Sequence, residues 1–242
     1  MFAFMRSVIS FRVAAREFDV RRRFFAAFVV ATCICGFPAV PSRAAEPAPT
    51  AAPRDFAAEF QAALMRAEAG SPGAIYRVAQ LYNAGLGTPA SPADYRVWLE
   101  RAAMRGHPYA QFELGMNLEM GFAGFPADPV AGFGWTLRAA RQGQPPAFQR
   151  VAADYASGTG TMPDPEEAYF WQLVAVNTDA ARLAEYQAKA RKDVADEGMI
   201  LFLTEILKAE NGLLDSYRIG LSPAVVAAIS TRAMAFAPKP EL

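Results

Sequence analysis

The stretch WLERAAMRG, residues 98–106, returns almost unchanged as WTLRAARQG at 135–143 and more weakly as WQLVAVNTD at 171–179. A tryptophan followed by small residues at helical spacing and then a glycine is no catalytic signature. Recurrence at a fixed distance indicates an internal repeat, which decides the fold before any single motif is considered.

Several other series recur in the same phase, each with a step of 36 or 37 residues. They are the tryptophans Trp98, Trp135 and Trp171; the glycines Gly70, Gly106 and Gly143; the alanines Ala74, Ala110 and Ala147; and a second set of glycines, Gly85, Gly121 and Gly158. Independent series that stay in phase are hard to obtain by chance. A period of this length is typical of helical solenoids.

Each unit is predicted to be a helical hairpin. In the first unit Ala74, Val78, Leu81 and Tyr82 fall at i, i+4, i+7 and i+8, which is one face of a helix. We expect the first helices to end at the second glycine set, where a left-handed cap needs no Cβ. The second helices should begin at Ser91, Asp128 and Asp164, each an N-cap residue followed by proline. The tryptophan seven residues later then fills the gap between hairpins.

The remaining segments are predicted to be helical caps. Residues 56–70 fit the frame of a second helix without its tryptophan, and 222–236 opens with a Ser-Pro helix start. Residues 180–196 and 198–210 read as two further helices. With no alternating strand pattern, the predicted fold class is all-α. It is a solenoid of about three helical hairpins over residues 55–179 with a C-terminal helical cap over residues 180–242.

The segments AIYRVAQLYNAGLG, 74–87, AQFELGMNLEMGFAG, 110–124, and DPEEAYFW, 164–171, together resemble the Sel-one-like repeat (SLR), a relative of the tetratricopeptide repeat. The resemblance covers about residues 55–179, with Gly132 where the repeat usually has alanine. It implies a right-handed superhelix of α-hairpins that binds other proteins and assembles complexes.

The N-terminal residues 1–44 are expected to be a signal peptide with a long basic region. Arg21 to Arg23 precede an apolar run of 14 residues, and small residues lead to a possible cut after Ala44. Residues 45–54 are rich in Ala and Pro and read as a linker. The general secretory route is favoured over the twin-arginine route, and an uncleaved membrane anchor is the alternative. We therefore expect a periplasmic or secreted protein that has no membrane contact after cleavage.

Composition narrows the chemistry of the mature chain. Both cysteines, Cys33 and Cys35, lie in the apolar run, and the rest of the chain from residue 45 has 17 basic against 22 acidic residues, which disfavours a nucleic-acid partner. His107 is the only histidine and sits in a turn between hairpins. The pair Glu166–Glu167 is interpreted as a helix terminus. We therefore expect no catalytic residue, cofactor or metal.

The expected binding surface is the concave face, which the first helices line. Outside the core stripe these helices offer seven candidate contact residues: Tyr76, Arg77, Gln80, Phe112, Met116, Gln149 and Arg150. A wider core, or a groove filled by the C-terminal helices, would explain the same residues. The expected function is an exported scaffold or adaptor in the cell envelope that binds another protein or peptide. The alternatives are a weak cell-wall hydrolase that uses the groove, and a membrane-anchored stabiliser of a complex.

Overall fold

The computed structural model describes residues 55–190 and 197–240, so the expected signal peptide and linker lie outside the described residues. In the described part, helices joined by turns and loops are the only regular secondary structure, and it contains no strand. Its helices are α2 (Phe56–Glu68), α3 (Pro72–Ala84), α4 (Pro92–Met104), α5 (Pro108–Met120), α6 (Pro129–Arg141), α7 (Pro145–Ser157), α8 (Pro165–Ala190), α9 (Glu197–Arg218) and α10 (Pro223–Met234). The predicted all-α class is confirmed.

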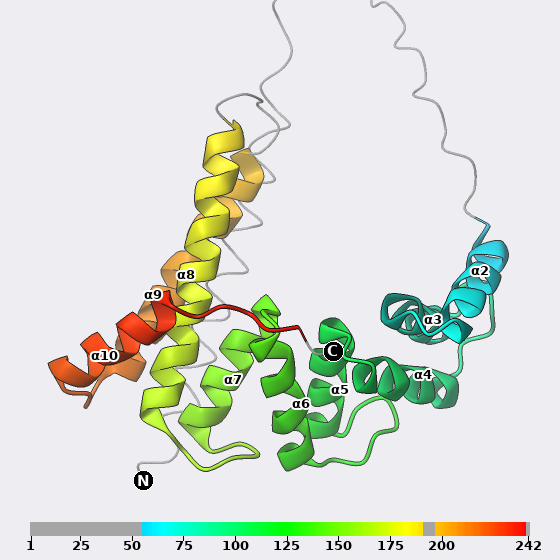
Figure 1. Ribbon diagram of the computed structural model, residues 1–242, viewed down its shortest axis with the longest axis horizontal. Coiled ribbons are helices and arrows are strands. Elements are labelled where there is room, and N and C mark those ends of the chain that lie inside the picture. Colours follow the sequence, from blue (N-terminus) through cyan, green and yellow to red (C-terminus); the bar gives the residue numbers. More distant parts are fainter. Residues whose placement is uncertain (1–54, 191–196, 241–242) are drawn as a thin grey trace, which may run out of the picture. The chain divides into compact units, whose positions relative to one another are not determined.

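The helices pack as consecutive hairpins (Figure 1). Helix α3 pairs with α4, α5 with α6, and α7 with α8, while α4 also contacts α5 and α6 contacts α7. Each helix therefore packs mainly on its neighbours in sequence, as in a solenoid of hairpins. Helix α2 covers α3 as the expected N-terminal cap.

The helix ends follow the predicted chemistry. Gly85, Gly121 and Gly158 cap the three first helices in the left-handed conformation, with φ of 65°, 70° and 75°. The side chains of Ser91 and Asp128 accept hydrogen bonds from the first turns of α4 and α6, and a proline opens both helices. The hairpin boundaries are thus set by local sequence.

The central hairpin has the closest backbone approach. A Cβ at Gly115 of α5 would lie 2.8 Å from the carbonyl oxygen of Gly132 on α6, and a Cβ at Gly132 would lie 2.8 Å from the Gly115 carbonyl oxygen. Two glycines therefore face each other where the helices cross. This explains why Gly132 replaces the alanine that the repeat usually has at this position.

Two core clusters run through the array. One joins α2 to α5 around Ile75, Leu81 and Leu99, and the other joins α6 to α10 around Phe148 and Trp171. The tryptophans are not equally buried. Trp171 is 3% exposed, whereas Trp98 and Trp135 are partly buried beneath the guanidinium groups of Arg101 and Arg138. The expected core role thus applies fully to Trp171 only.

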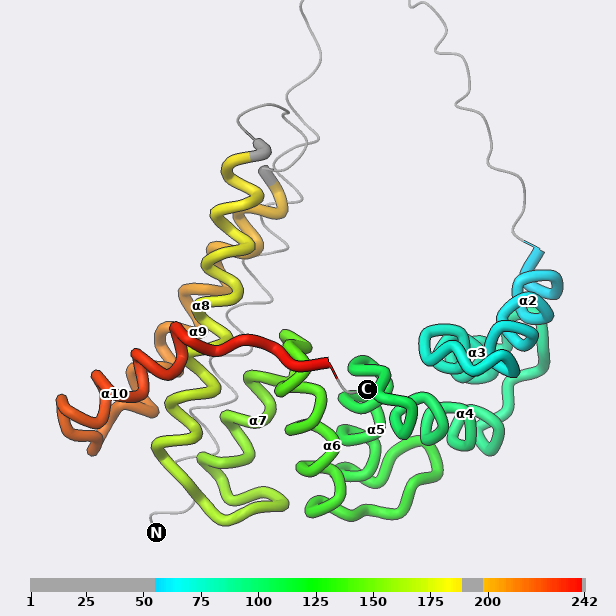
Figure 2. The backbone as a smooth tube through the Cα atoms, in the orientation of Figure 1, coloured from blue at the N-terminus to red at the C-terminus, as the bar shows by residue number. Residues whose placement is uncertain are grey.

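The C-terminal helices differ from the prediction. Residues 165–190 form the single helix α8 instead of ending near residue 179, and α9 runs beside it (Figures 1 and 2). Helix α8 continues through Asp179, whose carboxylate pairs with Arg182 one turn later, at 2.9 Å. Helix α10 packs against α8. In the two described ranges, no helix combines the length and apolar character needed to cross a membrane.

Candidate functional site

The surface formed by the first helices α3, α5 and α7 carries the seven predicted contact residues. Tyr76 of α3 donates a 2.8 Å hydrogen bond to the Glu113 carboxylate on α5, and Tyr95 of α4 donates a second, also at 2.8 Å. Burial and the neighbouring Glu113 carboxylate raise the pKa of both phenols, so both remain protonated donors. Tyr76 therefore braces the first repeat against the second.

The other polar candidates also have partners within the chain. Arg77 pairs with Glu59 on α2, with its Nε 2.9 Å from Oε1. Arg150 pairs with Glu119 on α5, and Gln149 hydrogen-bonds to Glu210 on α9. Helix α9 thus contacts the third repeat at Gln149, as one alternative interpretation of the sequence supposes.

The apolar candidates Phe112 and Met116 are only partly accessible to a binding partner. Phe112 is partly buried and packs against the second core cluster, although we expected it to lie outside the core. Met116 is also partly buried, one helical turn further along α5. Gln80 is partly buried and hydrogen-bonds to Tyr76. Phe112 therefore has a packing role, and both Phe112 and Met116 keep part of their surface accessible.

Two exposed residues, Tyr109 and Met120, extend this apolar surface. Tyr109 is 54% exposed and Met120 is 43% exposed. With Phe112 and Met116 they are spaced by three, four and four residues, so all four lie on one face of α5. We call these four residues the α5 stripe. Tyr109 and Met120 are not among the contact residues predicted from the sequence, although the same helical spacing from Phe112 and Met116 points to them.

His107 has a structural position. Its Nδ1 accepts a hydrogen bond from the backbone N–H of Ala110 at the start of α5, and its ring stacks on Tyr76 with centroids 4.6 Å apart. Burial lowers the pKa of His107, which favours the neutral imidazole that a hydrogen-bond acceptor requires. The side chain therefore caps the helix through Nδ1 and packs its ring face on Tyr76.

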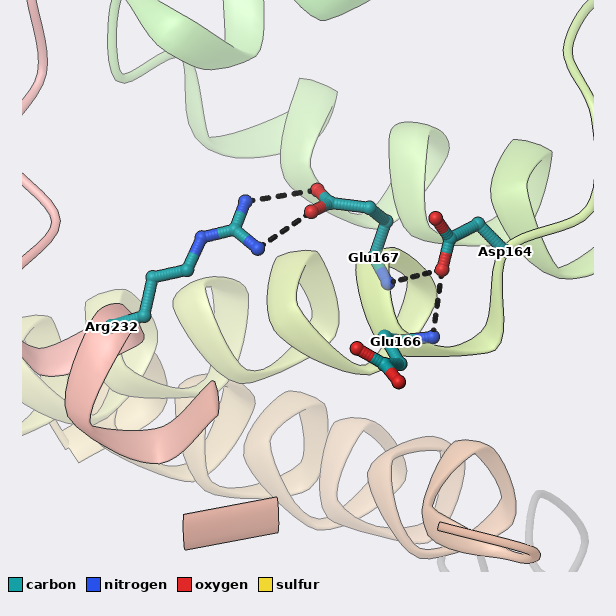
Figure 3. A network of polar contacts seen from close by, with 4 residues as sticks. All are labelled: Asp164, Glu166, Glu167 and Arg232. Atoms are coloured by element: carbon teal, nitrogen blue, oxygen red, sulfur yellow. Dashed lines mark hydrogen bonds and ion pairs between the residues drawn. The ribbon is translucent and has the colours of Figure 1, made fainter. Parts of the chain in front are cut away.

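The acidic pair at the start of α8 is also accounted for. The Asp164 carboxylate accepts hydrogen bonds from the backbone N–H groups of Glu166 and Glu167, at 3.0 and 3.1 Å (Figure 3). Glu167 binds both terminal nitrogens of Arg232 from α10, at 2.6 and 3.0 Å. This arrangement caps and braces a helix, as expected of acids at a helix N-terminus.

Two carboxyl groups are buried between helices. Burial raises the pKa of Asp154 on α7 to about 6, against the opposing effect of Arg150, 3.0 Å away. Burial and the nearby charge of Asp179 raise the pKa of Glu210 to about 7. Across residues 55–190 and 197–240, no group of three or more His, Cys, Asp or Glu side chains is placed to hold a metal ion.

Comparison with known proteins assigns the repeat. Residues 72–107, 108–144 and 149–171 match the model of the Sel1 repeat. The first two matches coincide with the hairpins α3–α4 and α5–α6, and the third covers most of α7 and the first turns of α8. A search of curated proteins gave no match.

Two solved structures match part of the chain. One is a Sel1 repeat protein from Oxalobacter formigenes, with 32% identity, 48% of this chain and 34% of that chain covered, and a TM-score of 0.47. The other is c5321, a protective antigen present in uropathogenic Escherichia coli strains displaying an SLR fold, with 25% identity, 55% and 28% coverage, and a TM-score of 0.47. The chain spans about a third of the length of each. The chain therefore carries three consecutive Sel1 repeats between residues 72 and 171.

Proposed function

We propose that this chain is a non-catalytic scaffold of the cell envelope that binds another protein or peptide through the α5 stripe. The observation that carries the proposal is the stripe itself, four large apolar side chains on one face of the central first helix, two of them substantially exposed. Exposed apolar surface framed by polar groups is typical of protein interaction sites.

The neighbouring polar groups support this choice of surface. Tyr76, Arg77, Gln149 and Arg150 are engaged by Glu113, Glu59, Glu210 and Glu119, respectively. Two of these contacts, Tyr76 with Glu113 and Arg150 with Glu119, join neighbouring first helices on either side of the stripe. A stripe held in this way loses less entropy on binding. The binding energy is then expected to come from the apolar anchors, with the polar groups forming a rim.

The absence of catalysis is part of the proposal. His107 caps α5, and Glu167 is held by Arg232, so neither stands beside a nucleophile in the manner of a general base. Sel1-type repeat arrays generally mediate protein–protein interaction, which agrees with a scaffold. The groove-based hydrolase suggested as an alternative finds no support in these contacts.

The proposed location is the periplasm or the exterior, reached by cleavage after Ala44. It is supported by the basic cluster Arg21 to Arg23, the short apolar run and the small residues before the cut. Intact-mass measurement of the chain recovered from the periplasm tests this. A product that begins at Ala45 and lacks cysteine supports export, whereas a membrane-bound product that keeps residues 24–37 supports the anchored alternative.

The partner is sought by crosslinking in living cells. A photoreactive amino acid replaces Met116 in the stripe, and in a control it replaces Val97, an exposed apolar residue of α4 outside the stripe. A protein that crosslinks from Met116 but not from Val97 supports the proposal. The same set of products from both positions, or none from Met116, contradicts it.

A further inference from the structure

A cavity of about 620 Å³ lies between α6, the start of α8 and residues 235–240. It shares no residue with the α5 stripe. It is lined by Arg138, Arg141, Gln142, Phe170, Trp171, Arg232, Ala235, Phe236, Ala237, Lys239 and Pro240. A volume of this size is typical of small-ligand sites, which hold a few apolar groups and a small number of placed polar ones.

One wall of the cavity is the segment that follows α10, which crosses toward α6 (Figure 1). The backbone N–H of Lys239 donates a 3.0 Å hydrogen bond to the carbonyl oxygen of Arg141. Pro238 packs against Gly143, where a Cβ would lie 2.6 Å from the proline ring. The segment is therefore attached to the end of α6 at two neighbouring points.

The apolar part of the lining is aromatic. The ring of Phe236 meets Trp171 edge-on with centroids 5.6 Å apart, and meets Phe170 in the same way at 6.2 Å. These contacts fix the shape of the apolar wall. The indole Nε1–H of Trp171 is buried and has no acceptor among the described residues.

The polar part of the lining is cationic, since Arg138, Arg141, Arg232 and Lys239 contribute to it and none of the lining residues is acidic. Glu167 neutralises Arg232 (Figure 3). Arg138 lies over the ring of Trp135 at 4.7 Å. Within the described part of the chain, the side chains of Arg141 and Lys239 have no acidic partner.

We propose that this cavity binds the carboxyl terminus of a peptide whose last residue is large and apolar. The aromatic wall of Phe170, Trp171 and Phe236 receives the apolar side chain, and Arg141 and Lys239 receive the terminal carboxylate. Cationic groups beside an apolar pocket complement this combination of chemistry, and capture of a terminal carboxylate is a recurring mode of peptide recognition. The inference goes beyond the proposed scaffold role because it assigns a second, independent site.

Titration calorimetry with the mature chain tests the assignment. The probe is the acetylated peptide Ala-Ala-Ala-Phe with a free carboxylate, and its control is the same peptide with a C-terminal amide. We expect the free acid to bind at least tenfold more tightly than the amide. Equal affinities, or no binding of the free acid at millimolar concentration, would overturn the assignment.

Paired variants locate the binding site. Arg141→Gln with Lys239→Gln removes the two cavity cations that receive the terminal carboxylate in this proposal, whereas Arg105→Gln with Lys208→Gln removes two exposed cations elsewhere. Both double variants change the net charge equally, and circular dichroism checks that both are folded. The first is expected to lose at least tenfold in affinity and the second to bind as the parent does. Equal losses in both variants would show a general charge effect and refute the site.

Discussion

The Tyr76 hydroxyl donates to the Glu113 carboxylate across 37 residues of sequence, and so joins the first helices of two successive repeats. The same carboxylate accepts from Tyr95, whose hydroxyl oxygen in turn accepts from the side-chain amide of Asn117 at 2.8 Å. One acidic side chain thus connects α3, α4 and α5. It fixes the register of the first two repeats beside the α5 stripe.

Replacement of Glu113 by alanine is therefore expected to destabilise the array. It leaves two part-buried phenols without their acceptor, at a cost of about 1–3 kcal/mol in the free energy of unfolding. Urea denaturation followed by circular dichroism measures the change. Glu100→Ala is the control, because Glu100 makes only a surface pair with Arg96 and should change stability by less than about 1 kcal/mol. Equal effects of both variants would contradict the bracing role.

The crossing of α5 and α6 predicts opposite outcomes for two glycines. Gly115→Ala places a methyl group against the Gly132 carbonyl oxygen and Thr136, and should destabilise the protein by about 1–3 kcal/mol. Gly134→Ala, on α6 itself, meets no neighbouring atom within 4 Å and should stabilise by up to about 1 kcal/mol. Melting temperatures of the two variants check this, and a stable Gly115→Ala variant would show that the helices can separate at no cost.

The contact between Glu210 of α9 and Asp179 of α8 predicts that the stability of the protein depends on pH. Glu210 has a pKa of about 7 when folded against an ordinary value of 4.5, because it is buried and faces Asp179, while the hydrogen bond from Gln149 and the charge of Arg182 offset this only in part. The folded state binds this proton more tightly than the unfolded chain, so stability from this group is present below pH 4.5 and is lost as the pH rises to about 7.

Glu210→Gln keeps the shape of the protonated acid, and so should be more stable than the parent at pH 8, with the difference vanishing near pH 4.5. Thermal melts across this range measure the difference. Glu205→Gln, an exposed change on the same helix, is the control and should follow the parent throughout. A variant that is no more stable than the parent at pH 8 would contradict a raised pKa of Glu210 beside Asp179.

The three repeat tryptophans should differ in their contribution to stability. Trp171 is buried among Phe148, Phe170 and Phe236, so Trp171→Ala is expected to cost about 3–5 kcal/mol. Trp135 is partly buried beneath Arg138, and its replacement should cost less. Denaturant titrations of the two variants rank them. The reverse order would mean that the middle hairpin depends on its tryptophan more than its burial indicates.

Much of the fold follows from local sequence. The caps at Gly85, Ser91 and Asp128 and the proline starts lie where the pattern puts them, because each depends on a few adjacent residues. The core contains more residues of each first helix than the predicted apolar stripe. Ile75 and Phe148 are buried beside the predicted stripe because each first helix packs on both its hairpin partner and the next repeat.

Fewer features of the candidate site could be predicted from the sequence. Gln149 hydrogen-bonds to Glu210, 61 residues later in the sequence. The repeat period does not predict a contact between a repeat and a capping helix. The same limit applies to α8, which continues through Asp179 at a position where earlier repeats have glycine. Tyr109 and Met120 could have been found, since they extend the helical spacing of Phe112 and Met116.

The most direct test of binding by the α5 stripe removes its two exposed ends in the variant Tyr109→Ser with Met120→Ser. The affinity of the crosslinked partner for this variant is then measured. Tyr109 is 54% exposed and Met120 is 43% exposed, so the melting temperature should stay close to that of the parent. We expect at least a tenfold weaker Kd, equivalent to about 1.4 kcal/mol, while Val97→Ser binds normally. An unchanged Kd in a folded double variant would contradict the claim that this stripe binds the partner.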